Sequence, residues 1–133
     1  NNMDGYYRGN INDVKSSEVK IGNSRDAYIQ WLITDRQEKS YAMRRFIIKP
    51  NGIIQMHYHD YYESLYIIRG KCIACVNNDS MELKSGDFIF IDSRFKHELI
   101  NNGSEDLEFI CVINYTKNMD IIPVNDECRD NVI

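Results

Sequence analysis

The sequence predicts an all-β fold, built as a sandwich or a closed barrel of short strands. From Tyr41 onward, short segments rich in Ile, Val, Phe and Tyr follow one another at close, regular spacing. Turn residues separate these segments, and no stretch in the central part of the chain has the periodicity of an amphipathic helix. The length of 133 residues suits one domain and allows a hydrophobic core without cross-links.

The N-terminal part of the chain contains one candidate strand. Ile29 and Trp31 alternate with Tyr28 and Gln30, and this period of two predicts a strand over 27–33. The later segments are rich in residues that favour strands. They predict strands over 41–48, 53–59, 63–69, 71–76, 87–92, 97–101 and 107–114.

Turn-forming residues separate the candidate strands. The segment 49–52, Lys-Pro-Asn-Gly, predicts a tight turn, because proline fixes φ and glycine accepts a positive φ. The segments 77–79 and 101–103 predict hairpin tips, and 85–87 predicts a further turn.

The whole chain, 1–133, is expected to form a single domain. We expect its barrel core at about 41–114. A polar N-terminal extension at 1–26 precedes the core. An acidic segment at 118–133 follows it and is expected to be a tail or a short helix.

The composition excludes several classes of partner. The net charge of −4, with acidic residues spread along the chain, argues against nucleic acid and against an anionic membrane surface. Apolar runs such as Phe88–Ile91 are far too short to span a membrane. The first residues contain no apolar region, so we expect no signal peptide and a cytoplasmic location.

The chain has four cysteines: Cys72, Cys75, Cys111 and Cys128. A domain of this size does not need disulfides, so we expect all four thiols to be reduced. Cys72 and Cys75 are three residues apart on one predicted strand, which points their sulfur atoms to opposite faces. They therefore cannot share a metal ion, and we expect both to be packing residues.

The three histidines of the chain lie in two segments. His57 and His59 are two residues apart on a predicted strand, so both imidazoles point to one face, together with Ile53 and Gln55. Glu63 opens the next predicted strand after a short turn. Imidazole and carboxylate ligands that converge on one face suit a divalent transition metal ion, and His97 is a candidate fourth ligand.

These segments resemble the two sequence motifs of the cupin superfamily. The stretch Gly52-(x4)-His57-x-His59-(x3)-Glu63-(x6)-Gly70 is similar to the first motif, and Gly86-(x5)-Asp92-x-Arg94-(x2)-His97-(x3)-Asn101 is similar to the second. The resemblance implies a double-stranded β-helix, also called a jelly roll or cupin barrel. It also implies one divalent transition metal ion per chain, Mn, Fe, Ni or Zn. The ligands that it implies are His57, His59, Glu63 and His97.

Three positions depart from the family pattern. The spacer before His57 is one residue short, which a turn absorbs. Asp92 replaces the proline of the family, and Arg94 replaces its second glycine. We therefore expect a different backbone before His97, and Arg94 is a candidate for a strained positive φ. None of these departures removes a ligand.

Three residues are candidates for the pocket around the metal: Gln55, Arg45 and Tyr41. Adjacent residues of a strand face opposite sides, so one of Arg44 and Arg45 faces the barrel interior. An inward arginine would favour an anionic substrate through bidentate pairing. The alternative is a surface or dimer-interface arginine.

Aromatic residues near the motifs have simpler interpretations. Tyr61 and Tyr62 lie in a predicted turn and are expected at the rim. Trp31 is expected in the core or at a dimer contact. Because small cupins resemble one another in pairing sheets across a two-fold axis, we expect a homodimer that uses the strand at 27–33.

Two classes of function remain open. The first is a metal-dependent enzyme of dioxygenase, isomerase or lyase type, acting on a small polar or anionic molecule. The complete ligand set favours this class. Thiol dioxygenases of the superfamily typically lack a glutamate ligand, so Glu63 argues against that branch. The second is a non-catalytic module that binds or senses a small molecule and has a structural metal.

Overall fold

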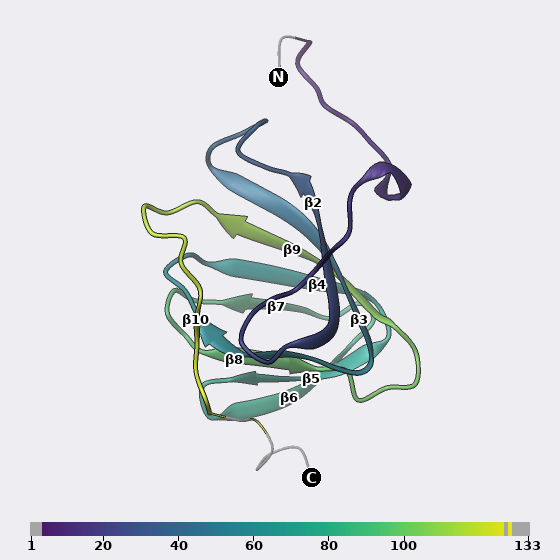
Figure 1. Cartoon of the computed structure of the whole chain (residues 1–133), viewed down its shortest axis with the longest axis vertical. Helices are drawn as coiled ribbons and strands as arrows, with labels where there is room; N and C mark the ends of the chain where they lie inside the picture. The colour runs from purple at the N-terminus through teal and green to yellow at the C-terminus, as the bar shows by residue number, and fades with distance from the viewer. Residues whose placement is uncertain (1–3, 127, 129–133) are drawn as a thin grey trace.

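The computed structural model describes residues 4–126 and 128, and its architecture is an all-β, nearly closed antiparallel barrel (Figure 1). This confirms the predicted fold class. The one helical element of the described residues is a short 3-10 helix, η1. The elements are η1 (Ile11–Asp13), β1 (Ser17–Glu18), β2 (Arg25–Ile33), β3 (Tyr41–Tyr58), β4 (Glu63–Arg69), β5 (Lys71–Val76), β6 (Asp79–Lys84), β7 (Phe88–Ile91), β8 (His97–Ile100), β9 (Leu107–Asn114) and β10 (Ile122–Pro123).

The long strand β3 joins the two sides of the barrel. Its first half pairs with β2 and β9, and β9 continues through β4 to β7. Its second half pairs with β8 and β10, and β8 continues through β5 to β6. One strand therefore contributes to both walls and carries side chains from one end of the barrel interior to the other.

The predicted turn at 49–52 is instead a bend inside β3. The residue with positive φ there is Asn51, at 69°, rather than Gly52. Gly52 is needed for a different reason, because a Cβ atom at this position would lie 2.8 Å from the carbonyl oxygen of Asp26. The bend is held from β8, since Asn51 N donates to Asn101 O and Asn101 N donates to Gly52 O, both at 3.0 Å.

The buried side chain of Asn101 holds this end of the barrel together. Its amide nitrogen donates to Ile48 O at 2.8 Å and to Glu105 O at 2.9 Å. Its amide oxygen accepts a hydrogen bond from Gly103 N at 2.9 Å. These bonds tie β3 to the connection between β8 and β9, within the predicted turn at 101–103.

Two elements differ from the sequence prediction. Strand β6 was not predicted, because Asp79–Lys84 has only two apolar residues, Met81 and Leu83, although these alternate with polar ones. The segment 118–133 was expected to be a tail or a short helix; its described residues contain no helix, and β10 pairs antiparallel with the end of β3. Residues 127 and 129–133 lie outside the described part of the chain. We call residues 115–126 the C-terminal strap; in Figure 1 its yellow ribbon runs down one side of the barrel.

The expectation of four reduced thiols is wrong for two of the cysteines. Cys75 on β5 and Cys128 form a disulfide, with Cα atoms 5.8 Å apart. The strap makes this possible because it returns along β3, where Val124 N donates to Met56 O. Cys72 and Cys111 are free and buried. A cytoplasmic location consequently loses the support that reduced thiols would have given.

The two faces of β5 are both buried, as its cysteines predict. Cys72 packs in the main hydrophobic core, whereas Cys75 packs with Met56 in a smaller cluster. In the main core the rings of Phe46 and Phe109 are stacked, with centroids 4.9 Å apart.

Large apolar side chains are also exposed on the outer face of β4 and β7, among them Tyr66, Phe88 and Phe90. In the described part of the chain, no helix has the length and apolar character that crossing a membrane requires.

Candidate metal centre

The four residues that the motifs single out come together inside the barrel. His57 lies near the end of β3, His59 directly follows that strand, and Glu63 and His97 open β4 and β8. One ligand atom from each lies within 4.8 Å of the others, and all four residues are buried. We call them the ligand cluster. Such a cluster is compatible with one divalent metal ion.

An irregularity in β3 gives His57 its direction. The pairing of β3 with β8 shifts register between Ile54 and His57, so His57 faces the same interior as Ile54. The prediction that Ile53 and Gln55 share this face is therefore wrong. After the shift, His57 pairs directly with His97, and their ring centroids are 4.3 Å apart.

Backbone carbonyl groups fix all three imidazoles in one tautomer. The Nδ1 atoms of His57, His59 and His97 lie 2.6, 2.9 and 2.8 Å from the carbonyl oxygens of Gln55, Tyr61 and Phe95. A carbonyl can only accept a hydrogen bond, so each Nδ1 carries the proton and donates. In a neutral imidazole this leaves the Nε2 lone pair free to bind a metal ion.

The contacts of His59 and His97 with Glu63 require a proton or a cation between the nitrogen and oxygen atoms. Nε2 of His59 is 2.9 Å from Glu63 Oε1, and Nε2 of His97 is 3.4 Å from the same oxygen. Two lone pairs at such distances repel each other unless a proton or a cation lies between them. Adjacent ligands of one ion, each at about 2.1 Å from it, are about 3 Å apart. His97 Nε2 is buried and forms no hydrogen bond, as expected of an atom positioned for a metal ion.

Without a metal ion, the cluster distributes its protons unevenly. Burial lowers the pKa of His57 to about 3, and the nearby His97 adds to this effect. Burial opposes ionisation of Glu63, but His97 and His59 outweigh it and hold its pKa well below the usual range. The same pairing with Glu63 outweighs burial at His97 and raises its pKa. The cluster therefore keeps an ionised carboxylate in a buried position, which favours a cation.

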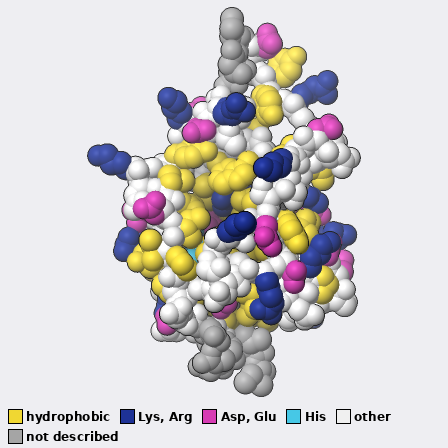
Figure 2. All heavy atoms as spheres, in the orientation of Figure 1, with side chains coloured by type: hydrophobic (Ala, Val, Ile, Leu, Met, Phe, Trp, Pro, Cys, Tyr) yellow, Lys and Arg dark blue, Asp and Glu magenta, His cyan; other side chains and the backbone are white. Residues whose placement is uncertain are grey.

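The ligand cluster lies in the wall of a cavity of about 420 Å³. Figure 2 shows hydrophobic side chains gathered on this face, with a trace of histidine colour between them. Arg44 also lines the cavity and is only 5% exposed. Its guanidinium donates to Cys111 Sγ at 3.0 Å, but its Nε has no hydrogen-bond partner. A buried cationic group with an unused donor faces the same space as the ligand cluster.

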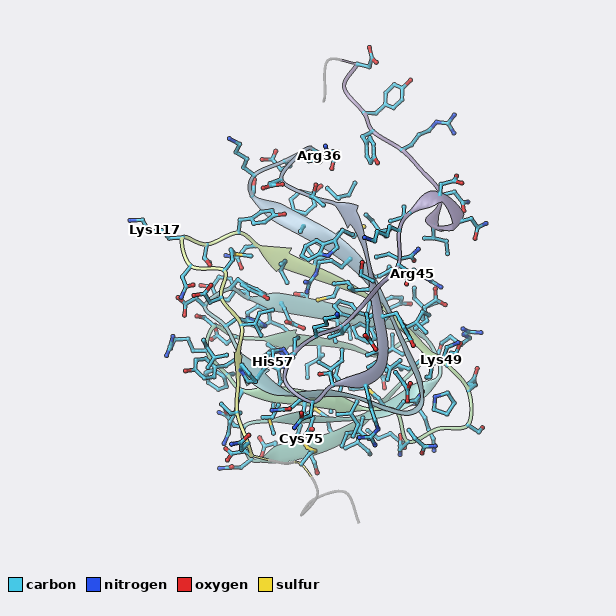
Figure 3. The ribbon with its side chains drawn as sticks, in the orientation of Figure 1. Arg36, Arg45, Lys49, His57, Cys75 and Lys117 are labelled. Carbon is cyan, nitrogen blue, oxygen red and sulfur yellow. A yellow bond between two sulfur atoms is a disulfide. The ribbon has the colours of Figure 1, made fainter. Side chains whose placement is uncertain are left out.

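The three residues predicted for the pocket lie elsewhere. Arg45 faces away from the cavity and pairs with Glu108 at 2.6 Å, and Figure 3 shows it well apart from His57. Gln55 points to the other side of β3 and donates to Val124 O of the C-terminal strap at 3.0 Å. Tyr41 does not line the cavity and is exposed. The inward arginine is therefore Arg44, because the alternation of Ala42, Arg44 and Phe46 faces inward.

Two aromatic residues lie closer to the site than expected. Tyr61 is buried and stacks on His59, with ring centroids 3.7 Å apart, whereas the neighbouring Tyr62 is exposed. Trp31 lines the cavity and its ring lies 5.0 Å from the Arg44 guanidinium. In the sequence, the only signal for these roles was the position of Tyr61 between His59 and Glu63.

The turn before His97 has the unusual backbone that the sequence predicts. Arg94 has a φ of 66°. Its N–H donates to His59 O at 2.8 Å, and its guanidinium donates to Asp60 Oδ1 at 2.8 Å. The substituted position therefore ties the segment before His97 to the segment after His59.

Comparison with known proteins agrees with this architecture. The sequence profile of the cupin domain matches residues 44–113. An oxalate-binding protein from Thermotoga maritima is 33% identical over 110 residues, which cover 75% of this chain and 91% of that protein. A solved structure from the same organism, described as a predicted oxalate decarboxylase, has a TM-score of 0.66 at 25% identity and covers 79% of this chain and 96% of its own.

A polyketide cyclase from Streptomyces resistomycificus has a TM-score of 0.82, over 92% of this chain and 88% of its own. Its identity of 19% shows a likeness of fold alone. The profile match spans more than half of the chain and contains the whole ligand cluster. This chain is therefore a member of the cupin family.

Proposed function

We propose that the protein holds one divalent transition metal ion, Mn, Fe, Ni or Zn, on the ligand cluster and binds a small carboxylate beside it. The observation that carries the proposal is the position of Arg44. A buried guanidinium with an unpartnered Nε lines the same cavity as three imidazoles and a carboxylate. A bound metal ion and the Arg44 guanidinium would be two positive groups facing one cavity, and together they would favour an anionic ligand.

The relatives support the same class of ligand. One is named as an oxalate-binding protein and another as a predicted oxalate decarboxylase. We extend this chemistry, a small carboxylate, to the present chain.

Each group of the site has a distinct part in binding. When bound, the ion would supply Lewis acidity and open coordination positions for oxygen ligands. Arg44, which lines the same cavity, would donate to a carboxylate oxygen. The carbonyl bonds to the three Nδ1 atoms keep the imidazoles oriented, and stacking on Tyr61 holds the His59 ring in place. The apolar walls exclude water, which strengthens these polar contacts.

We propose a metal-dependent enzyme of dioxygenase, isomerase or lyase type as the first candidate activity. One observation favours a second candidate, a non-catalytic binding or sensing module. Apart from the ligand cluster, the only carboxylate that lines the cavity in the described part of the chain is Glu18, which is exposed. Outside the ligand cluster, the described residues therefore place no buried carboxylate in the cavity wall that could act as a general base.

Metal content and ligand binding test the proposal in two steps. Protein purified without chelators or metal-affinity resin should contain about one metal ion per chain by elemental analysis. His97→Ala and Glu63→Gln should lose most of it, because the remaining groups cannot complete the site. Glu108→Gln is the matched control, since Glu108 pairs with Arg45 outside the cavity. Full occupancy in His97→Ala would contradict the ligand assignment.

The second step is calorimetry with oxalate. The metal-loaded protein should bind oxalate, and the metal-free protein should not. Binding without turnover of any tested carboxylate would favour the non-catalytic candidate. If the metal-loaded protein binds neither oxalate nor aromatic carboxylates at millimolar concentration, the proposed ligand class is refuted.

A further inference from the structure

The cavity has two ends of different chemistry. One end contains the ligand cluster and Arg44. The rest of the wall is apolar, and its residues come from several strands and from the C-terminal strap. They include Ile29, Trp31, Phe46, Phe109, Met119 and Ile121.

The volume of the cavity exceeds what a simple dicarboxylate needs. At about 30 Å³ for each water of the liquid, 420 Å³ corresponds to roughly 14 waters. Oxalate consists of two joined carboxylate groups and would fill only a small part of this space. About ten waters would then remain against apolar walls, where they find few hydrogen-bond partners. The cavity is in the size range of sites for larger organic ligands.

The apolar wall contains flat surfaces. Phe46 and Phe109 line the cavity but stack on each other, at an angle of 8°, and are only 7% and 1% exposed, so they contribute apolar wall rather than a free ring face. Trp31 adds an indole that lies near the Arg44 guanidinium. Aromatic walls of this kind favour a planar apolar group, which can pack against them.

The apolar walls are partly built by segments outside the matched cupin domain. Residues 18–21, on and after β1, and Ile29 and Trp31 of β2 contribute on the N-terminal side. The C-terminal strap contributes Met119 and Ile121. All of these lie outside residues 44–113, whereas the ligand cluster lies inside them. The residues of the ligand cluster thus belong to the matched domain, whereas the apolar wall is shared between that domain and the segments that flank it.

We infer that the ligand is amphipathic: a carboxylate or hydroxy-carboxylate head that reaches the ligand cluster and Arg44, joined to a planar apolar body that fills the rest of the cavity. This inference rests on the proposed function for the head group and extends it to the body. It makes oxalate a fragment of the true ligand rather than the ligand itself.

Three probes that each have a metal-chelating carboxylate head distinguish an amphipathic ligand from a simple small carboxylate. The full chain, loaded with Zn²⁺, is titrated with oxalate, salicylate and 3-hydroxy-2-naphthoate, and binding is followed by calorimetry and by the fluorescence of Trp31, the only tryptophan. Salicylate and the naphthoate share one chelating head and differ by one fused ring. Burial of that ring should tighten binding about tenfold.

Two neighbouring residues of the C-terminal strap supply a matched pair of variants. Ile121 lines the cavity and Ile122 does not, although their exposed fractions are similar, 38% and 40%. Ile121→Asp should remove the gain from the second ring and leave oxalate binding unchanged. Ile122→Asp should change neither.

Three outcomes decide between the ideas. A tenfold gain from the second ring that is lost in Ile121→Asp alone supports the inference. Metal-dependent oxalate binding with no gain from the second ring overturns the inference and leaves the proposed function standing. If none of the three probes binds the Zn²⁺-loaded protein, the proposed function fails and the inference fails with it.

Discussion

The disulfide between Cys75 and Cys128 should contribute a large part of the stability of the fold. It closes a loop of 53 residues and joins Cys128, just beyond the C-terminal strap, to β5. Cys128→Ala removes the cross-link and also a side chain that is only 2% exposed. Reduction of the wild-type protein with dithiothreitol removes the cross-link alone.

The expected magnitude follows from the length of the loop. In the chain-entropy model, a cross-link over 53 residues stabilises the folded state by about 4 kcal/mol. Cys128→Ala should cost somewhat more than reduction, because the small cluster of Met56, Cys75 and Cys128 also loses contacts. Dithiothreitol should have little effect on the Cys128→Ala variant.

Urea unfolding with and without dithiothreitol measures these differences, and a thiol assay in denaturant counts the cross-links. The oxidised wild-type protein should show two free thiols, from Cys72 and Cys111. The strap also lines the cavity through Met119 and Ile121, so reduction should weaken binding of apolar ligands. If two thiols are counted and reduction leaves the unfolding midpoint unchanged, the entropic argument is refuted. If four free thiols are counted in the oxidised protein, the disulfide between Cys75 and Cys128 is refuted.

Further predictions concern Arg44, Asn101, Cys72 and the quaternary structure. Arg44→Met should weaken oxalate binding about tenfold or more in calorimetry and leave the metal content unchanged, because a charged hydrogen bond contributes about 1.5–3 kcal/mol. Asn101→Ala should lower the free energy of unfolding by about 3 kcal/mol, since it removes the three hydrogen bonds of a buried side chain, whereas Ala at the exposed Asn102 should change it little. Burial raises the pKa of Cys72 from 9.0 to about 12, so its native thiol should react slowly with iodoacetamide at pH 8. As the pH rises from 9 toward 12, the unfolded chain loses this proton and the folded one keeps it, so stability should fall in urea titrations. We still expect a homodimer through the strand at 27–33, and a monomeric mass by light scattering at micromolar concentration would contradict it.

The sequence predicted the features that depend on residues close together in the chain. Turn residues and strand-forming residues located most of the barrel, because their preferences depend on a few neighbours. The spacing of His57, His59 and Glu63 located three of the ligands, because only a short turn separates these residues in the chain. His97 was located by the resemblance to the cupin motifs, and it reaches the others through the pairing of β8 with β3. Arg94 at a position that requires positive φ was visible in the same way.

The missed features depend on contacts between segments far apart in the chain. The pairing of Cys75 with Cys128 requires the C-terminal strap to return along β3 for several residues, and nothing near either cysteine predicts that path. Likewise, Trp31 reaches the cavity only because β2 pairs with the first half of β3.

The choice between Arg44 and Arg45 shows most clearly why the pocket was harder to predict than the metal centre. On a regular strand, residues an even number of positions apart face the same side. Arg45 and His57 are twelve positions apart, so this rule places Arg45 on the face of His57. Two irregularities intervene: the bend at Asn51 and the register shift between Ile54 and His57. Each can reverse the parity, and hydrophobic alternation offers no correction, because both arginines have apolar neighbours at the flanking positions of their own face. A residue near the ligands in sequence is therefore predictable, whereas a residue that reaches them along a bent strand is assigned only when every irregularity between the two is known.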